Sequence, residues 1–259
     1  MDGLTVGLLV PVVGTTLGAS FVYALKDRIP AKINNIFMGF TAGVMIAAAV
    51  WSLLIPSMEM TGGDGLAAVM PAVGGFVLGV VFLLAMDYAV PHQHGADSSS
   101  EGPRSKTSRT WKLVLAIILH NIPEGMAIGV AFAAVMEGSS YLSVAGALAL
   151  SIGISIQNVP EGAIVSLPLR DAGNSKNRAF GIGFLSGVVQ PVAALLTIWL
   201  ASVIVPLMPL LLAFAAGAMI YVVVEELIPA SAHGPHSNLG PIGFVAGFLL
   251  MIMLDAALN

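Results

Sequence analysis

Cysteine is absent from this sequence, and charge is scarce. The 259 residues include 10 Lys or Arg and 14 Asp or Glu, so that only 9% are charged. Without cysteine the chain has no disulfides and no thiolate ligands, and any metal must be held by nitrogen, oxygen or methionine sulfur. The formal net charge of −4 is too small to indicate a charged macromolecular partner, and we expect no nucleic-acid binding.

Long apolar runs take up most of the chain instead. Hydrophobic residues make up 57% of it and the mean hydropathy is +0.94, which excludes an ordinary soluble domain. Runs of about 18 or more apolar residues predict membrane-spanning helices. We expect one all-α integral membrane domain over residues 1–259, an eight-helix bundle in the lipid bilayer, with a mobile loop at 91–109. The expected spans are about 5–25, 34–58, 66–88, 111–136, 140–168, 178–204, 206–229 and 239–258.

The basic residues fall on alternate connections between these spans. The three basic connections contain Lys26, Arg28 and Lys32; Arg104, Lys106, Arg109 and Lys112; and Arg170, Lys176 and Arg178. Cytoplasmic loops of membrane proteins carry an excess of Lys and Arg. The pattern therefore predicts that these connections are cytoplasmic and that both termini lie on the extracytoplasmic side of the cell (inner) membrane.

Six of the spans carry a Gly-x-x-x-Gly pair, which allows two helix backbones to approach closely in lipid. The pairs are Gly14/Gly18, Gly39/Gly43, Gly75/Gly79, Gly125/Gly129, Gly183/Gly187 and Gly243/Gly247. We expect them to pack the bundle, and a homodimer face is the alternative use.

One six-residue phrase occurs in two consecutive spans. It reads His120-Asn121-Ile122-Pro123-Glu124-Gly125 and then Gln157-Asn158-Val159-Pro160-Glu161-Gly162. Each copy places two metal-capable side chains one helical turn apart on one face. A carboxylate at bilayer depth is expensive and marks a functional site by default. Because consecutive spans run in opposite directions, the copies form an inverted pair of the kind that transporters place around a midplane site.

The paired side chains suit a transition metal. If the two helices touch, the imidazole of His120, the amide oxygen of Gln157 and the carboxylates of Glu124 and Glu161 converge. This set fits Zn²⁺, and also Fe²⁺, Mn²⁺ or Cd²⁺, as a transported substrate and not as a catalytic cofactor. The prolines of the two copies predict kinked fourth and fifth helices, with the freed carbonyls facing the metal path.

Two other classes of protein would also place glutamates in kinked helices. An intramembrane metalloenzyme is one, but the zinc-protease pattern His-Glu-x-x-His is absent. A proton- or sodium-coupled carrier of an organic solute is the other, and it leaves His120 unexplained. A divalent-metal transporter, not an enzyme, accounts for all four residues.

The double phrase resembles the fourth and fifth helices of the ZIP (Zrt/Irt-like) divalent-metal transporters, especially the bacterial members. The resemblance covers nearly the whole chain. Further matches are Ser52-Leu53-Leu54-Ile55-Pro56, then Asp87 followed by Pro91-His92-Gln93-His94, and Glu225-Glu226-Leu227-Ile228-Pro229.

The resemblance implies a binuclear metal centre and movement of metal into the cytoplasm, by a carrier-like or a channel-like mechanism. The first metal would be held by His120, Glu124, Gln157 and Glu161, with Met45 as a soft ligand. The second would lie among Asn121, Asn158 and Gln190 and share the two glutamates. Family members often have an acidic residue in place of Asn158 or Gln190, so we expect one well-occupied metal here and a weak or absent second one.

Weaker signals mark the two ends of a path. Ser52 and Glu59 lie toward the outer end of the second span and are candidate entrance residues. Asp87, His92, His94 and Glu226 lie toward inner helix ends and are candidate exit ligands. Asp255, an acid in the last span, carries no functional prediction.

Overall fold

The computed structural model describes residues 3–24, 30–61, 65–89, 109–203, 207–232, 234 and 237–258. Within these residues every regular element is a helix, and eight helices are long and apolar enough to cross a membrane, which confirms the predicted class. The elements are α1 (Gly3–Ala24), α2 (Ala31–Ala47), η1 (Ala48–Leu54), α3 (Ile55–Glu59), α4 (Leu66–Ala89), α5 (Arg109–Met136), α6 (Val144–Asp171), α7 (Lys176–Val203), α8 (Met208–Val222), η3 (Val223–Leu227), α9 (Ile228–Ser231) and α10 (Leu239–Leu258). The loop predicted at 91–109 lies, except for Arg109, outside the described residues.

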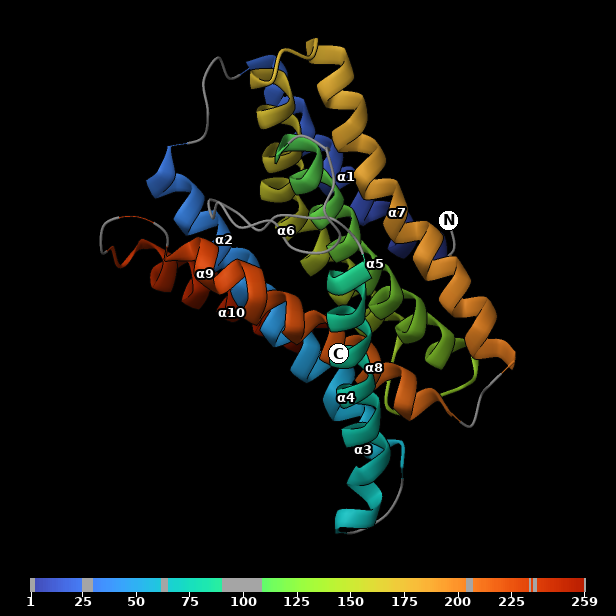
Figure 1. Cartoon of the computed structure of the whole chain (residues 1–259). Coiled ribbons are helices and arrows are strands. Elements are labelled where there is room, and N and C mark those ends of the chain that lie inside the picture. Colours follow the sequence, from blue (N-terminus) through green and yellow to red (C-terminus); the bar gives the residue numbers. More distant parts are fainter. Residues whose placement is uncertain are drawn as a thin grey trace.

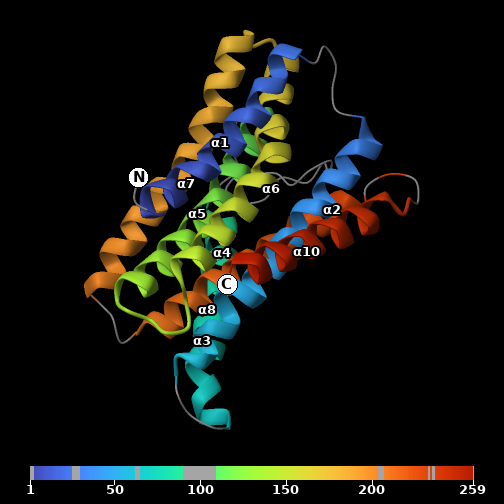
Figure 2. The ribbon, with the colours of Figure 1, turned by 180° about the vertical axis from the view of Figure 1, so that it is seen from behind.

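The helices form two groups that meet along α5, α6 and α8. Helices α1, α5, α6 and α7 run side by side, whereas α2 and α10 cross them obliquely as a second pair (Figure 1). The view from behind shows the same grouping (Figure 2), and α4 packs along α8. The two groups contact each other through α5 with α8 and through α6 with α2 and α10. Residues on α5 and α6 therefore lie in the middle of the molecule.

The six glycine pairs bring helices of this one chain together. A methyl group added at Gly14 or Gly18 of α1 would lie 1.9 Å from a backbone carbonyl oxygen of α6. The pairs on α2, α4, α5 and α10 meet backbone carbonyls of a neighbouring helix in the same way, α2 with α10, α4 with α8 and α5 with α7, whereas Gly183 and Gly187 of α7 meet side chains of α1. Bundle packing thus accounts for every pair, and these pairs offer no separate face for a second copy.

Two of the long helices contain a widened π segment. In η1 the backbone N–H of Ile55 bonds to the carbonyl of Val50, and in η3 that of Ile228 bonds to the carbonyl of Val223. Each segment is followed by a proline, Pro56 or Pro229, and both prolines stand in a Leu-Ile-Pro sequence. Proline cannot donate to the carbonyl four residues earlier, and π segments often occur at functional sites. The η3 segment contains Glu226, one of the predicted exit residues.

Candidate metal centre

Glu124 on α5 is the centre of a buried polar cluster. Its side chain is fully buried. One carboxylate oxygen accepts a hydrogen bond from Nε2 of Gln157 on α6 at 2.6 Å, and the other accepts from Nε2 of Gln190 on α7. The two copies of the repeated phrase are therefore in direct contact, and α7 adds a third side chain to them.

Close approach of the backbones makes these contacts possible. A methyl group at Gly125 would lie 2.3 Å from the backbone carbonyl oxygen of Gln190, and one at Gly162 would lie 2.1 Å from that of Thr15. Because these glycines directly follow Glu124 and Glu161, they let α7 and α1 reach the level of the carboxylates. The sequence places a glycine in both copies for this steric reason.

Three amide side chains complete the cluster on the α7 side. Gln190 donates to Oδ1 of Asn121 at 3.2 Å and accepts from Nδ2 of Asn158 at 2.8 Å. Asn121 donates in turn to the carbonyl of Ser186 at 2.7 Å, and Asn158 to that of Pro11 at 3.2 Å. All three amides are buried. They connect four helices through neutral groups at the place where the resemblance implies a second metal.

Three buried oxygen atoms on α6 have no hydrogen-bond donor. They are Oε1 of Gln157, Oδ1 of Asn158 and Oε2 of Glu161. The carboxyl group of Glu161 also lies near those of Glu124 and Glu226. All three unpaired atoms are acceptors, and a buried acceptor without a partner is destabilising by about 1–3 kcal/mol. A cation is the kind of group that would satisfy several of them at once.

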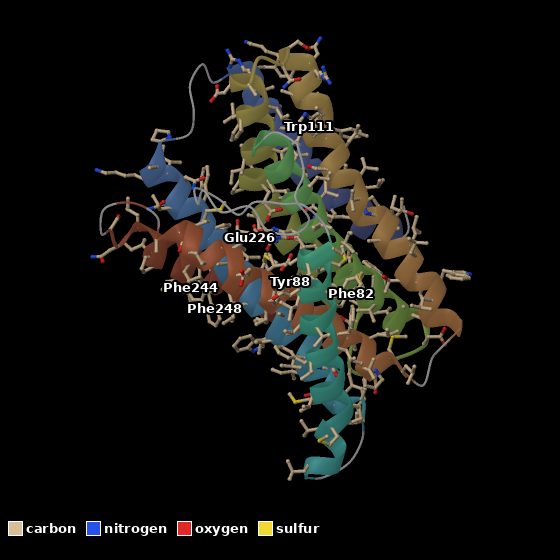
Figure 3. The ribbon with its side chains drawn as sticks, viewed as in Figure 1. Phe82, Tyr88, Trp111, Glu226, Phe244 and Phe248 are labelled. Carbon is tan, nitrogen blue, oxygen red and sulfur yellow. The ribbon has the colours of Figure 1, made fainter. Side chains whose placement is uncertain are left out.

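His120 lies beside a different carboxylate from the one expected. Its Nε2 is 3.0 Å from Oε1 of Glu226 on η3, and both side chains are largely buried. Glu226 lies near the middle of the molecule, between the helix groups (Figure 3). In the described part of the chain, no three carboxylate or imidazole side chains are grouped as a metal site. The predicted ligands are thus neighbours here without forming a finished coordination shell.

Of the remaining predicted ligands, Met45 and Asp87 are buried in the described part of the chain. Met45 is buried in the main hydrophobic core on α2. Asp87 at the end of α4 is buried and accepts a hydrogen bond from the hydroxyl of Tyr221 on α8. His92 and His94 are outside the described residues.

A polar cavity of about 540 Å³ contains both predicted entrance residues. Its lining comes from three parts of the chain, Trp51, Ser52, Ile55, Pro56 and Glu59; Ser139, Ser140, Tyr141, Leu142, Ser143 and Gly146; and Asp255. The hydroxyl of Ser52 donates to Oδ1 of Asp255 at 3.3 Å. Sequence reasoning missed Asp255, and its isolation as an acid in an apolar run was the one available signal.

Comparison with known proteins identifies a single family. A sequence model of the ZIP zinc transporters matches residues 89–255. The zinc transporter ZIPB of Bordetella bronchiseptica is 39% identical over 95% of this chain and 78% of its own. The zinc transporter GufA of Myxococcus xanthus is 36% identical over 99% of both chains. The human zinc transporter ZIP11 is 34% identical over 95% of this chain and 94% of its own.

Proposed function

Because this chain belongs to the ZIP zinc transporter family, we propose that it carries Zn²⁺ into the cytoplasm through the buried cluster on α5, α6 and α7. The chain is a membrane transporter of divalent metal and not an enzyme. Neither the organic-solute carrier nor the intramembrane metalloenzyme finds support among the relatives. Cd²⁺, Fe²⁺ and Mn²⁺ are further candidate substrates, because the same oxygen and nitrogen donors suit them.

The observation that carries the proposed site is the set of unpaired acceptors on α6. Oxygens of Gln157, Asn158 and Glu161 lack donors, and the carboxylate of Glu124 lies directly against Gln157. A dication would supply the missing partner to several oxygens and offset the two glutamate charges. His120 would complete the set with nitrogen, the donor that favours zinc over calcium or magnesium.

The prolines of the repeated phrase support a path through the cluster. Pro123 and Pro160 lie inside α5 and α6. Because proline has no backbone N–H, the carbonyls of Leu119 and Ile156 lack their α-helical donors. We infer that both helices bend there and that these carbonyls face the metal path, since freed carbonyls at bilayer depth are tolerated where they line a cavity.

The two ends of the path follow from the predicted orientation. Ser52, Glu59 and Asp255 line the cavity beside the α5–α6 connection, which lies outside in the predicted topology. We infer that this cavity is the metal entrance and that both termini are extracytoplasmic. Glu226, Asp87, His92 and His94 would then receive the ion on the cytoplasmic side. A homodimer in the inner membrane remains a separate proposal, since the glycine pairs do not supply its face.

Zinc entry into proteoliposomes that contain a metal indicator tests the site. We expect saturable entry for the wild type and a loss of at least about tenfold for Glu124→Gln, because a charged ligand becomes neutral at constant volume. Glu137→Gln is the matched control, since Glu137 is exposed at the end of α5 and should behave as the wild type.

A Glu124→Gln protein that remains folded and transports at the wild-type rate would contradict the site. Uptake of zinc by cells that express the wild type tests the direction. Cells that lose zinc on expression would contradict import, whatever the outcome for the site.

A further inference from the structure

We propose that Gln190 restricts this buried centre to one metal ion, because its side-chain amide takes the position from which a second cation would bind Glu124. The inference rests on the proposed function, since it concerns the occupancy of the same centre. It assigns to a neutral residue on α7 a part in determining the stoichiometry of binding.

Both polar atoms of the Gln190 amide are hydrogen-bonded. Its nitrogen donates to Glu124 and, at 3.2 Å, to Asn121, while its oxygen accepts from Asn158 at 2.8 Å. The side chain is fully buried. Because an N–H group already faces the second oxygen of Glu124, a cation approaching that oxygen from α7 would meet a partial positive charge.

The backbone holds Gln190 in this place. A methyl group at Gly125 would lie 2.3 Å from the carbonyl oxygen of Gln190 and 2.8 Å from its Cα, so α7 is in direct contact with α5 at this level. The backbone of Gln190 cannot withdraw from α5 without a shift of the whole helix, and three hydrogen bonds hold its side-chain amide against Glu124 and its neighbours. The amide is therefore a fixed part of the centre and not a mobile surface group.

The three unpaired oxygens of the cluster all belong to side chains of α6. Oε1 of Gln157, Oδ1 of Asn158 and Oε2 of Glu161 have no donors, whereas both polar atoms of Gln190 are satisfied. The oxygens available to a cation are thus on α6, while the amide of Gln190 on α7 already has partners at both polar atoms. One ion placed there would use the available acceptors.

The charges of the buried carboxylates also favour a single bound dication. Glu124 and Glu161 together carry two negative charges at most, which one dication neutralises. A second dication would leave an uncompensated double positive charge in a buried place, which is strongly unfavourable. The third nearby carboxylate, Glu226, is paired with His120 and 12% exposed, so it compensates less than a fully buried group would.

Counting bound zinc in the purified, detergent-solubilised chain tests the inference. Each variant is equilibrated by dialysis against buffered free Zn²⁺, and bound zinc is measured by mass spectrometry per mole of protein. The Glu124→Gln/Glu161→Gln double variant supplies the background, which removes zinc held elsewhere on the chain. We expect one zinc per chain above this background for the wild type and a twofold rise, to two, for Gln190→Glu.

Two further variants separate the position of the amide from charge alone. Asn121→Asp adds a carboxylate but keeps the oxygen to which the Gln190 amide donates, and Gln190→Met removes the amide without adding charge. Both should remain at one zinc. Two zinc ions in the wild type, one in folded Gln190→Glu, or two in Asn121→Asp would each overturn the role of Gln190. No zinc above background in the wild type would overturn the proposed function itself, and the inference with it.

Discussion

The contact between Gly125 and α7 gives a prediction whose size follows from the structure. The alanine variant Gly125→Ala places a methyl group 2.3 Å from the carbonyl oxygen of Gln190, where ordinary contact begins at 3.4 Å. Helix α7 must therefore retreat by about 1 Å, a strain that typically destabilises by about 1–3 kcal/mol. Alanine also gains up to about 1 kcal/mol of helix propensity, so the net loss of stability is about 0–2 kcal/mol.

Function should suffer more than stability in this variant. A retreat of about 1 Å stretches the hydrogen bond from Gln190 to Glu124 beyond the normal range and releases the carboxylate from its fixed position. A misplacement of about 1 Å at a working site can reduce a rate by roughly a hundredfold. We therefore expect a small decrease in melting temperature together with a loss of zinc flux of at least about tenfold.

A matched glycine on the same helix as Gln190 provides the control. A methyl group added at Gly181 meets nothing within 4 Å, so Gly181→Ala should gain only helix propensity and transport normally. Melting temperature is read by thermal unfolding of the detergent-solubilised chain, and flux in proteoliposomes. If Gly125→Ala transports as well as Gly181→Ala, the close approach of α7 has no part in the site and the reasoning is refuted.

Three other side chains give predictions of their own. Glu226→Gln should lower zinc flux by roughly tenfold to a hundredfold, because it neutralises the carboxylate beside His120. Glu225→Gln changes the exposed neighbouring residue and should transport normally. Equal flux in the two variants would exclude Glu226 from the path. Asp255→Asn should raise the zinc concentration at half-maximal flux severalfold and leave the maximal flux nearly unchanged, because a carboxylate at the rim of the cavity concentrates cations. A lower maximal flux alone would argue against an entrance role. Tyr221→Phe should destabilise the fold by about 1–3 kcal/mol, because buried Asp87 loses the phenolic donor. An unchanged unfolding temperature would show that this hydrogen bond contributes nothing to stability.

Much of this architecture could be predicted because it depends on local sequence. Eight apolar runs determine the helical class, since a backbone in lipid must satisfy its own hydrogen bonds. The repeated phrase also predicted that Glu124 and Gln157 would meet, because the same turn on two antiparallel neighbours falls at a similar depth. The six glycine pairs predicted close helix contacts, and the structure confirms each within one chain.

Other features depend on groups far apart in the sequence. Ser52 and Asp255 are 203 positions apart, and only the crossing of α10 over η1 brings them to one cavity. The direction of the amide hydrogen bonds around Gln190 is set by four helices together, so no local pattern reveals which oxygens remain unpaired. The π segments had a local signal in the repeated Leu-Ile-Pro, but a proline alone does not distinguish a kink from a widened turn.

The first residue of the repeated phrase is His120 in one copy and Gln157 in the other. These two side chains also lie at different depths in the membrane. Helices α5 and α6 are antiparallel, and Glu124 is level with Gln157, so the turn that leads to His120 and the turn that leads to Glu161 extend the same way, by about 6 Å. In the predicted orientation that way is toward the cytoplasm, where Glu226 adjoins His120. An ion from the outer cavity would thus meet the amide of Gln157 with one carboxylate first. It would then meet an imidazole between two carboxylates, which places the stronger donors after the weaker ones along the inward path.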